Sequence, residues 1–233
     1  MKKINVGIIG VGRIGSLHAR SITHHIPSAK VLGITDINTA NLKSLADELS
    51  IEKIYSGFEE MLDDPEIDAV LICSSTDTHA DIAVKAAQKG KHIFCEKPVD
   101  LTPEKVLKVK EAVEKAGVVF QVGFNRRFDH NFSKIKEFVA SGKIGETHIV
   151  KITSRDPAPP PAQYSAVSGG MFLDMTIHDF DLACYMLGEE PVEVFATGGR
   201  LIDPQMMSEL NDYDSAMVIM RTASGKQCHI NNL

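Results

Sequence analysis

A glycine-rich turn near the start constrains the fold of this chain more than any other feature. The sequence GVGRIG at residues 10–15 follows a short apolar run and precedes helically spaced apolar residues. In a strand–turn–helix unit the three glycines have separate tasks. Gly10 permits a tight turn, Gly12 lets a pyrophosphate approach the backbone, and Gly15 lets helix and strand pack closely. The turn therefore predicts a dinucleotide-binding domain that holds phosphates at a helix N-terminus.

A carboxylate at the end of the next predicted strand indicates which dinucleotide binds. Asp36 lies about 20 residues after Gly15 and follows the apolar strand predicted at 31–35. A carboxylate there can accept hydrogen bonds from both ribose hydroxyls of an adenosine, and it repels the 2′-phosphate of NADP. We therefore predict NAD as the cofactor. The alternative is a glycine-rich turn that serves packing alone, with Asp36 as a surface turn residue.

Other residues predicted to contact NAD lie in the same turn or after later strands, because an open α/β sheet binds its ligand outside the carboxyl ends of its strands. Arg13 can contact a phosphate oxygen, although a solvated arginine fits equally well. The segment 74–76 can line the nicotinamide side or simply cap the next helix. The predicted cofactor-binding residues are Gly10, Gly12, Arg13, Ile14, Gly15, Asp36, Ser74, Ser75, Thr76, His79, Glu96 and Lys97.

The order of strands and helices predicts two domains. Apolar strands and amphipathic helices alternate between residues 4 and 122, which is typical of a parallel sheet with helices on both faces. After Gly123 most strands follow one another without crossover helices, which favours antiparallel pairing. We therefore expect an α/β protein with an NAD-binding Rossmann domain at 1–123. A second, substrate-binding domain at 124–233, built on an open, mainly antiparallel sheet, is predicted to be C-terminally incomplete because a strand ends directly at Leu233.

Composition and charge exclude several classes of protein. The net charge of -6, without a dense basic patch, argues against nucleic acid or an acidic membrane as partner. Four scattered cysteines without a CxxC pair fit a reducing cytoplasm. The N-terminal apolar run resembles a secretion signal, but Gly7, Gly10 and Arg13 interrupt it. Because no stretch of about 18 apolar residues occurs, we expect a cytoplasmic protein without membrane spans.

Two residues in a helix predicted at 171–187 suggest acid–base chemistry. Asp174 and His178 lie four positions apart, so both project from one face of an α-helix. A carboxylate can orient an imidazole, and a histidine is a natural general base for an alcohol proton. A solvated pair, or an aspartate that interacts with the helix dipole, is the alternative. Zinc is disfavoured because the spacing of Asp174, His178, Asp181 and Cys184 matches no usual zinc pattern, and we predict no metal.

A lysine lies after another predicted strand. Lys97 follows Glu96 and precedes Pro98, at the end of the apolar run 92–95. That position is on the ligand-binding edge of an open α/β sheet. Lys97 is therefore a candidate for the active site, and a solvated ion pair with Glu96 is the alternative.

Four ordered motifs resemble the Gfo/Idh/MocA family of oxidoreductases. They are GVGRIG at 10–15, CEKP at 95–98, GFNRRF at 123–128 and DMTIHD at 174–179. Within that family, SRDP at 154–157 and GGMFLD at 169–174 are most similar to the inositol 2-dehydrogenases. The resemblance extends over residues 4–232. It implies a Rossmann domain followed by an α/β domain whose open sheet joins subunits into homodimers or homotetramers.

The resemblance also assigns roles to individual residues. Lys97, Asp174 and His178 match the catalytic residues of the family, and the Lys97–Pro98 bond is expected to be cis. The residues that it places on the substrate side are Arg126, Asp156, Met175 and Asp181.

The implied activity is NAD-dependent oxidation of a cyclic polyol, first of all myo-inositol to 2-keto-myo-inositol. Two alternatives remain open. One is a catalytically silent or regulatory dinucleotide-binding protein on the same fold. The other is a dehydrogenase of a different sugar or polyol. Family members are longer than this chain, so whether the chain ending at Leu233 turns over substrate is a separate question.

Overall fold

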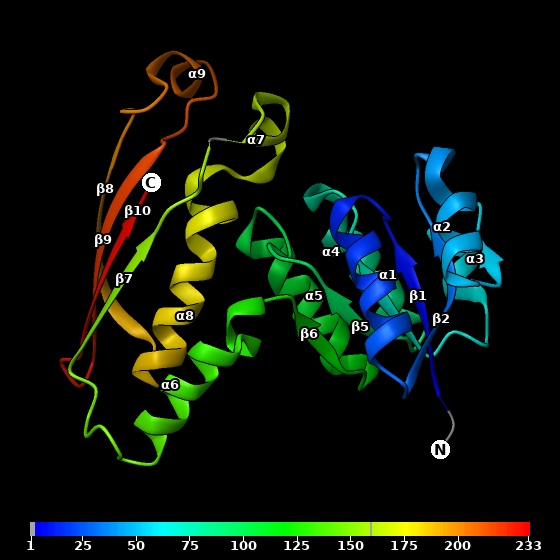
Figure 1. The fold of residues 1–233 in the computed structure, drawn as a ribbon, viewed down its shortest axis with the longest axis horizontal. Helices are drawn as coiled ribbons and strands as arrows, with labels where there is room; N and C mark the ends of the chain where they lie inside the picture. Colours follow the sequence, from blue (N-terminus) through cyan, green and yellow to red (C-terminus); the bar gives the residue numbers. More distant parts are fainter. Residues whose placement is uncertain (1–2, 159) are drawn as a thin grey trace. The chain divides into compact units, whose positions relative to one another are not determined.

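The structure is a computed structural model that describes residues 3–158 and 160–233. The chain divides into two compact units, Met1–Gly123 and Phe124–Leu233. Figure 1 shows that parallel strands and their helices make up the first unit, and that a second sheet with its own helices makes up the other. No helix among the described residues combines the length and the apolar character that a membrane crossing requires.

The first unit is built on a six-stranded parallel sheet with the order β3-β2-β1-β4-β5-β6. This order reverses between β1 and β4, and a reversal of this kind leaves a crevice at the carboxyl ends of those two strands. The predicted parallel sheet is therefore confirmed. Its strands are β1 (Ile4–Ile9), β2 (Ala29–Thr35), β3 (Lys53–Ile54), β4 (Ala69–Ile72), β5 (His92–Cys95) and β6 (Phe120–Val122).

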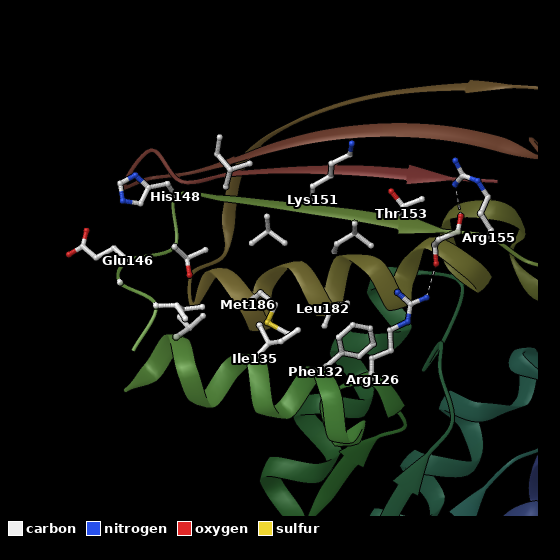
Figure 2. Close-up of a pocket in the computed structure, with 18 residues that line it drawn as sticks. Arg126, Phe132, Ile135, Glu146, His148, Lys151, Thr153, Arg155, Leu182 and Met186 are labelled. Atoms are coloured by element: carbon white, nitrogen blue, oxygen red, sulfur yellow. Dashed lines mark hydrogen bonds between the residues drawn. The ribbon is translucent and has the colours of Figure 1, made fainter. Parts of the chain in front are cut away.

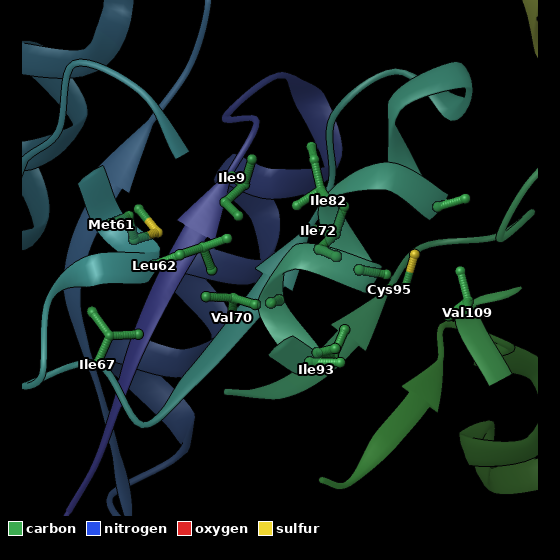
Figure 3. Packing of buried hydrophobic residues seen from close by; sticks show 14 of the residues in the cluster. Ile9, Met61, Leu62, Ile67, Val70, Ile72, Ile82, Ile93, Cys95 and Val109 are labelled. Carbon is green, nitrogen blue, oxygen red and sulfur yellow. The ribbon is translucent and has the colours of Figure 1, made fainter. Parts of the chain in front are cut away.

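Helices cover both faces of this sheet because its central strands are apolar on both sides. On one face α1 and α2 bury residues such as Ala19 and Leu45 against Ile8. On the other face α3, α4 and α5 form a second core, in which Met61 and Val70 are fully buried (Figure 3). The helical elements are α1 (Arg13–His25), η1 (Thr39–Asn41), α2 (Leu42–Leu49), α3 (Phe58–Asp63), α4 (Thr76–Gln88) and α5 (Pro103–Ala116).

The second unit is built on a four-stranded mixed sheet with the order β7-β10-β9-β8. The pairs β10–β9 and β9–β8 are antiparallel as predicted, whereas β7 and β10 run parallel. The helix α8 packs against β7, and α6 lies beside α8 (Figure 1). The elements are η2 (Asn125–Phe128), α6 (His130–Ala140), β7 (Ile149–Ser154), α7 (Ala162–Ser168), η3 (Met171–Thr176), α8 (Ile177–Leu187), β8 (Pro191–Gly199), α9 (Pro204–Glu209), β9 (Ser215–Thr222) and β10 (Gln227–Asn232).

The helix predicted at 171–187 has the predicted bounds, but its first part is not α-helical. Residues Met171–Thr176 form a π-helix, η3, and the α-helix begins only at Ile177. The hydroxyl of Thr176 donates to the carbonyl of Met171 at 2.9 Å, a separation of five residues that fits the wider turn. Asp174 and His178 therefore lie on either side of a helix junction, and α-helical spacing does not describe how they relate.

Candidate functional site

The glycine turn has the geometry that its predicted tasks require. Gly10 has a φ of +86°, and a Cβ atom there would lie 2.6 Å from the backbone nitrogen of Ser74. A Cβ atom on Gly15 would lie 1.9 Å from the carbonyl oxygen of Gly10. At Gly12, by contrast, a Cβ atom would meet no described atom within 4 Å. Two glycines thus allow tight packing, and the third leaves open space beside the N-terminus of α1, where a pyrophosphate fits.

Asp36 is held against this turn at the end of β2. Its Oδ2 accepts the backbone N–H of Val11 at 2.7 Å, and its Oδ1 accepts that of Asn38 at 2.8 Å. An ionised carboxylate has about four acceptor positions, so two remain for ribose hydroxyls. The structure therefore places the predicted acid beside the predicted phosphate-binding turn.

Replacing Asp36 with asparagine is expected to weaken NADH binding about tenfold while NADPH binding improves relative to NADH. The amide oxygen can still accept the N–H of Val11, but the negative charge that repels a 2′-phosphate is gone. Asp68→Asn is the matched control, because Asp68 likewise accepts a backbone N–H, that of Asn5, near the start of β1 and away from the glycine turn. Fluorescence titration with both cofactors measures the change, and an unaltered preference for NADH contradicts the assignment.

The carboxyl end of β4 continues the cofactor edge. The hydroxyls of Ser74 and Thr78 are 2.7 Å apart, and the hydroxyl of Thr78 donates to the carbonyl of Ser75. His79 is only 2% exposed, with Nδ1 2.8 Å from the carbonyl oxygen of Pro98 and Nε2 3.1 Å from that of Ser74. The His79 side chain therefore connects two loops at this edge, and its predicted contact with NAD remains a prediction.

The loop after β5 carries Glu96 and Lys97, and its Lys97–Pro98 bond is cis, as the family resemblance predicted. One oxygen of Glu96 lies 2.7 Å from Nε2 of His18, whose ring also packs edge-on against Phe94. Glu96 is thus held between α1 and the ends of β5 and β6, where a Cβ atom on Gly123 would approach it to 3.0 Å. Sequence reasoning missed His18, because its approach to Glu96 depends on how α1 packs against β5.

Two cysteines near this edge are packing residues. Cys95 is fully buried, and Cys73 is partly buried. Burial raises the pKa of the Cys73 thiol to about 12, and the nearby Glu96 carboxylate adds to this effect. Burial also raises the pKa of Cys95. Both thiols therefore stay protonated at neutral pH and pack as small hydrophobic side chains.

Asp174 and His178 belong to the second unit, on η3 and the first turn of α8 respectively. The Tyr164 hydroxyl donates to Oδ1 of Asp174 at 2.9 Å. The carboxylate of Asp212 accepts the backbone N–H of Met171 at 3.0 Å, which fixes the start of η3. Lys97, the third predicted catalytic residue, lies in the first unit, so the two units divide the predicted catalytic set between them.

Arg126 takes part in a buried polar network rather than lying free in solution. It forms an ion pair with Asp179, which is fully buried, and donates to Oγ of Ser154 at 3.0 Å. The Asn232 amide donates to the other Asp179 oxygen at 2.7 Å and to the Thr176 hydroxyl at 3.2 Å. Burial raises the pKa of Asp179, and the Arg126 guanidinium opposes that effect. A guanidinium has five N–H donors, and the contacts with Asp179 and Ser154 do not use all of them. The role of Arg126 in substrate binding stays a prediction.

The remaining predicted substrate residues differ in their surroundings. The Asp181 carboxylate accepts three hydrogen bonds from Arg127, at 2.7–3.0 Å. Asp156 is exposed, and its backbone N–H donates to the carbonyl of Leu233 at 3.1 Å. Met175 is half-buried on η3, next to Asp174. Met175 therefore lies on η3 just before the start of α8, Asp181 lies about one turn into α8, and Asp156 lies beyond the end of β7.

A cleft of about 920 Å³ lies between α6, β7 and α8 within the second unit (Figure 2). Phe132 of α6 and Leu182 and Met186 of α8 point into it, and Arg126 lies at one end. Neither Asp174 nor any other residue of η3 lines this cleft. The cleft is thus separate from the predicted catalytic residues of this unit.

No cluster of three metal-ligating side chains occurs among residues 3–158 and 160–233.

Two family models match the chain. The NAD-binding Rossmann-fold domain of the Gfo/Idh/MocA oxidoreductases matches residues 4–124, and the C-terminal domain of the same family matches residues 132–232. The chain belongs to the Gfo/Idh/MocA oxidoreductase family. The predicted family, the α/β fold class and NAD as cofactor are thereby confirmed.

The relatives include several inositol dehydrogenases. The chain is 47% identical to the myo-inositol 2-dehydrogenase of Thermotoga maritima, with 98% of this chain and 68% of that protein aligned. It is 45% identical to the inositol 2-dehydrogenase of Rhizobium meliloti, again over 98% and 68% of the two chains. A structure of the Lactobacillus casei scyllo-inositol dehydrogenase with bound NAD(H) and scyllo-inositol has a TM-score of 0.91 at 33% identity, covering 99% of this chain and 69% of that one. The chain thus spans about two thirds of the length of these relatives.

Proposed function

We propose that the protein is an NAD-dependent dehydrogenase that oxidises a CH–OH group of a cyclic polyol, with myo-inositol converted to 2-keto-myo-inositol. The observation that carries the proposal is 47% identity, along 98% of this chain, to a myo-inositol 2-dehydrogenase. The open space at Gly12 beside Asp36 supports it independently, because those residues fit the cofactor that the reaction needs.

In the proposed reaction the substrate loses a hydride from a ring carbon to NAD and a hydroxyl proton to His178. NAD, when bound, supplies the acceptor for the hydride that leaves the ring carbon. His178 takes the hydroxyl proton, and Asp174 holds His178 in position. Lys97 donates a hydrogen bond to the reacting oxygen, where its positive charge stabilises the developing alkoxide. The substrate-side roles of Arg126, Asp156, Met175 and Asp181 belong to the same proposal.

An assay of NADH formation tests the function. Purified protein is mixed with NAD⁺ and myo-inositol, and absorbance at about 340 nm is followed against scyllo-inositol and glucose in parallel. Turnover with myo-inositol supports the proposal, and turnover with another substrate alone replaces it with a different polyol or sugar dehydrogenase. Binding of NADH without turnover of any of these selects the silent or regulatory alternative.

The scattered free cysteines support a cytoplasmic location.

We also propose that the second sheet joins subunits into a homodimer or homotetramer. On the face of the sheet that points away from α8, Phe195 and Ile219 are cross-strand neighbours, and both are more than half exposed. Met217 on the same face is 47% exposed. Contiguous exposed apolar side chains of this kind mark a protein–protein contact.

Replacing Ile219 with lysine is expected to shift the protein to a smaller species, because a charge at the centre of an apolar contact is left without a partner. Leu107→Lys is the control, since Leu107 is similarly exposed but lies on α5 of the first unit. Sedimentation velocity on the wild type and both variants measures the change. A wild-type monomer, or an Ile219→Lys variant with the wild-type mass, contradicts the proposed assembly.

A further inference from the structure

Tyr164 lies where it can control the carboxylate of Asp174. The two residues are ten positions apart, on α7 and η3, yet the Tyr164 hydroxyl donates to Oδ1 of Asp174 at 2.9 Å. Neither composition nor periodicity indicated this contact, because α7 is a short helix directly after a proline-rich segment.

The backbone between the two residues is fixed by conformations that only glycine adopts readily. Gly169 ends α7 with a φ of +93°, and Gly170 follows with a φ of +73°. A Cβ atom on Gly170 would lie 2.5 Å from the carboxylate of Asp212. Two successive left-handed residues therefore turn α7 back toward η3, and any other residue type at Gly170 would displace Asp212.

The backbone of η3 is held at both ends. At its start, Asp212 accepts the N–H of Met171. At its end, the buried Thr176 donates to the carbonyl of Met171 and itself accepts from Asn232. These contacts determine where the Asp174 backbone lies. The Tyr164 hydroxyl acts on the side chain itself, because its hydrogen bond to Oδ1 favours one rotation of the carboxylate.

We propose that Tyr164 is a positioning residue for the dehydrogenase reaction, which acts by fixing the orientation of the Asp174 carboxylate. The inference rests on the proposed function, in which Asp174 orients His178. A hydrogen bond to Oδ1 restricts the rotation of the carboxylate that orients the imidazole. A π-helical segment such as η3 frequently occurs at a functional site, and small misplacements of a catalytic group lower the rate steeply.

Tyr164→Phe removes only the hydroxyl, and Tyr213→Phe is the matched control. Tyr213 is also about half exposed in the same unit, but it packs through its ring against Phe172 and Arg200. The kcat of Tyr164→Phe is expected to fall about tenfold, with the KM for inositol, the Kd for NADH and the Tm nearly unchanged. Tyr213→Phe is expected to leave all four values unchanged. A wild-type kcat in Tyr164→Phe overturns the inference.

A double-mutant cycle separates positioning from a general structural effect. In an Asp174→Asn background, where turnover is measured at high enzyme concentration, Tyr164→Phe is expected to lower kcat less than about twofold further. An equal loss in both backgrounds means that Tyr164 acts through another residue, which overturns the inference.

A second readout needs no turnover, so failure of the proposed function can be recognised separately. The chain has four tyrosines and no tryptophan, so its emission comes from tyrosine. Subtracting the Tyr164→Phe spectrum from that of the wild type gives the emission of Tyr164. This emission is expected to change on Asp174→Asn, because the hydroxyl loses a charged acceptor. An unchanged emission overturns the contact, whereas absent polyol turnover with a changed emission counts against the proposed function alone.

Discussion

Replacing Lys97 with alanine is expected to lower kcat for inositol oxidation by at least about a hundredfold, because one charged donor to the reacting oxygen typically contributes that much to a rate. The position supports the expectation. Lys97 follows β5 directly, at the carboxyl end of the parallel sheet and next to Glu96, which is held by His18. The cofactor turn lies along the same edge, since β1 and β5 both flank β4.

The measurement is steady-state NADH formation at saturating NAD⁺, with NADH affinity determined separately by fluorescence. Because Lys97 is also predicted to contact the cofactor, the two measurements distinguish weaker binding from slower chemistry. Lys110→Ala is the control, since Lys110 lies exposed on α5, in a distant ion pair with Glu114 at 3.9 Å. Near-normal kcat in Lys97→Ala would remove Lys97 from the catalytic set and leave the solvated ion pair as its explanation.

Local patterns in the sequence were sufficient to predict the parallel α/β character of the first unit and its cofactor turn, although not the short elements β3 and α3. The turn at 10–15 works through contacts within one strand–turn–helix unit, so residue type and spacing determine its geometry. Gly15 shows this directly, because no side chain fits against the carbonyl of Gly10. Asp36 was equally accessible, since it lies at the end of the very next strand and bonds back to Val11.

The second unit could be predicted only in outline, because its site depends on contacts between distant segments. The π-helical turn at η3 is stabilised by Asp212, which lies 41 residues further along the chain. Tyr164 reaches Asp174 only because two left-handed glycines reverse the backbone. A short helix such as α7 has too few residues to show helical periodicity. The spacing of Asp174 and His178 therefore pointed to candidate residues and not to their actual arrangement.

Asp179 illustrates a polar residue whose importance is structural. Its side chain is fully buried, whereas that of its partner Arg126 is 23% exposed. Two of its contacts come from distant parts of the unit, namely η2 through Arg126 and β10 through Asn232. The carboxylate therefore connects the start of α8 to both the sheet and the segment that enters the unit. Without it, a largely buried cation and a buried amide would each lose a charged acceptor.

Replacing Asp179 with alanine is expected to reduce the free energy of unfolding by about 3 kcal/mol, as is typical when one partner of a buried ion pair is removed. Asp181→Ala is the matched control, two residues further along the same helix. Its partner Arg127 is 42% exposed, so water can replace the lost acceptor, and a loss of about 1 kcal/mol or less is expected.

Urea unfolding followed by circular dichroism compares these variants, and hydrogen exchange in α8 and β10 locates the loss in the second unit. The double variant Arg126→Met, Asp179→Leu is expected to recover more than half of the stability lost in Asp179→Ala, because no buried charge is then left unpaired. Equal losses in the free energy of unfolding for Asp179→Ala and Asp181→Ala would mean that the buried Arg126–Asp179 pair stabilises the protein no more than the more exposed Arg127–Asp181 pair. In that case the start of α8, and with it His178, must be held mainly by apolar packing around Leu182.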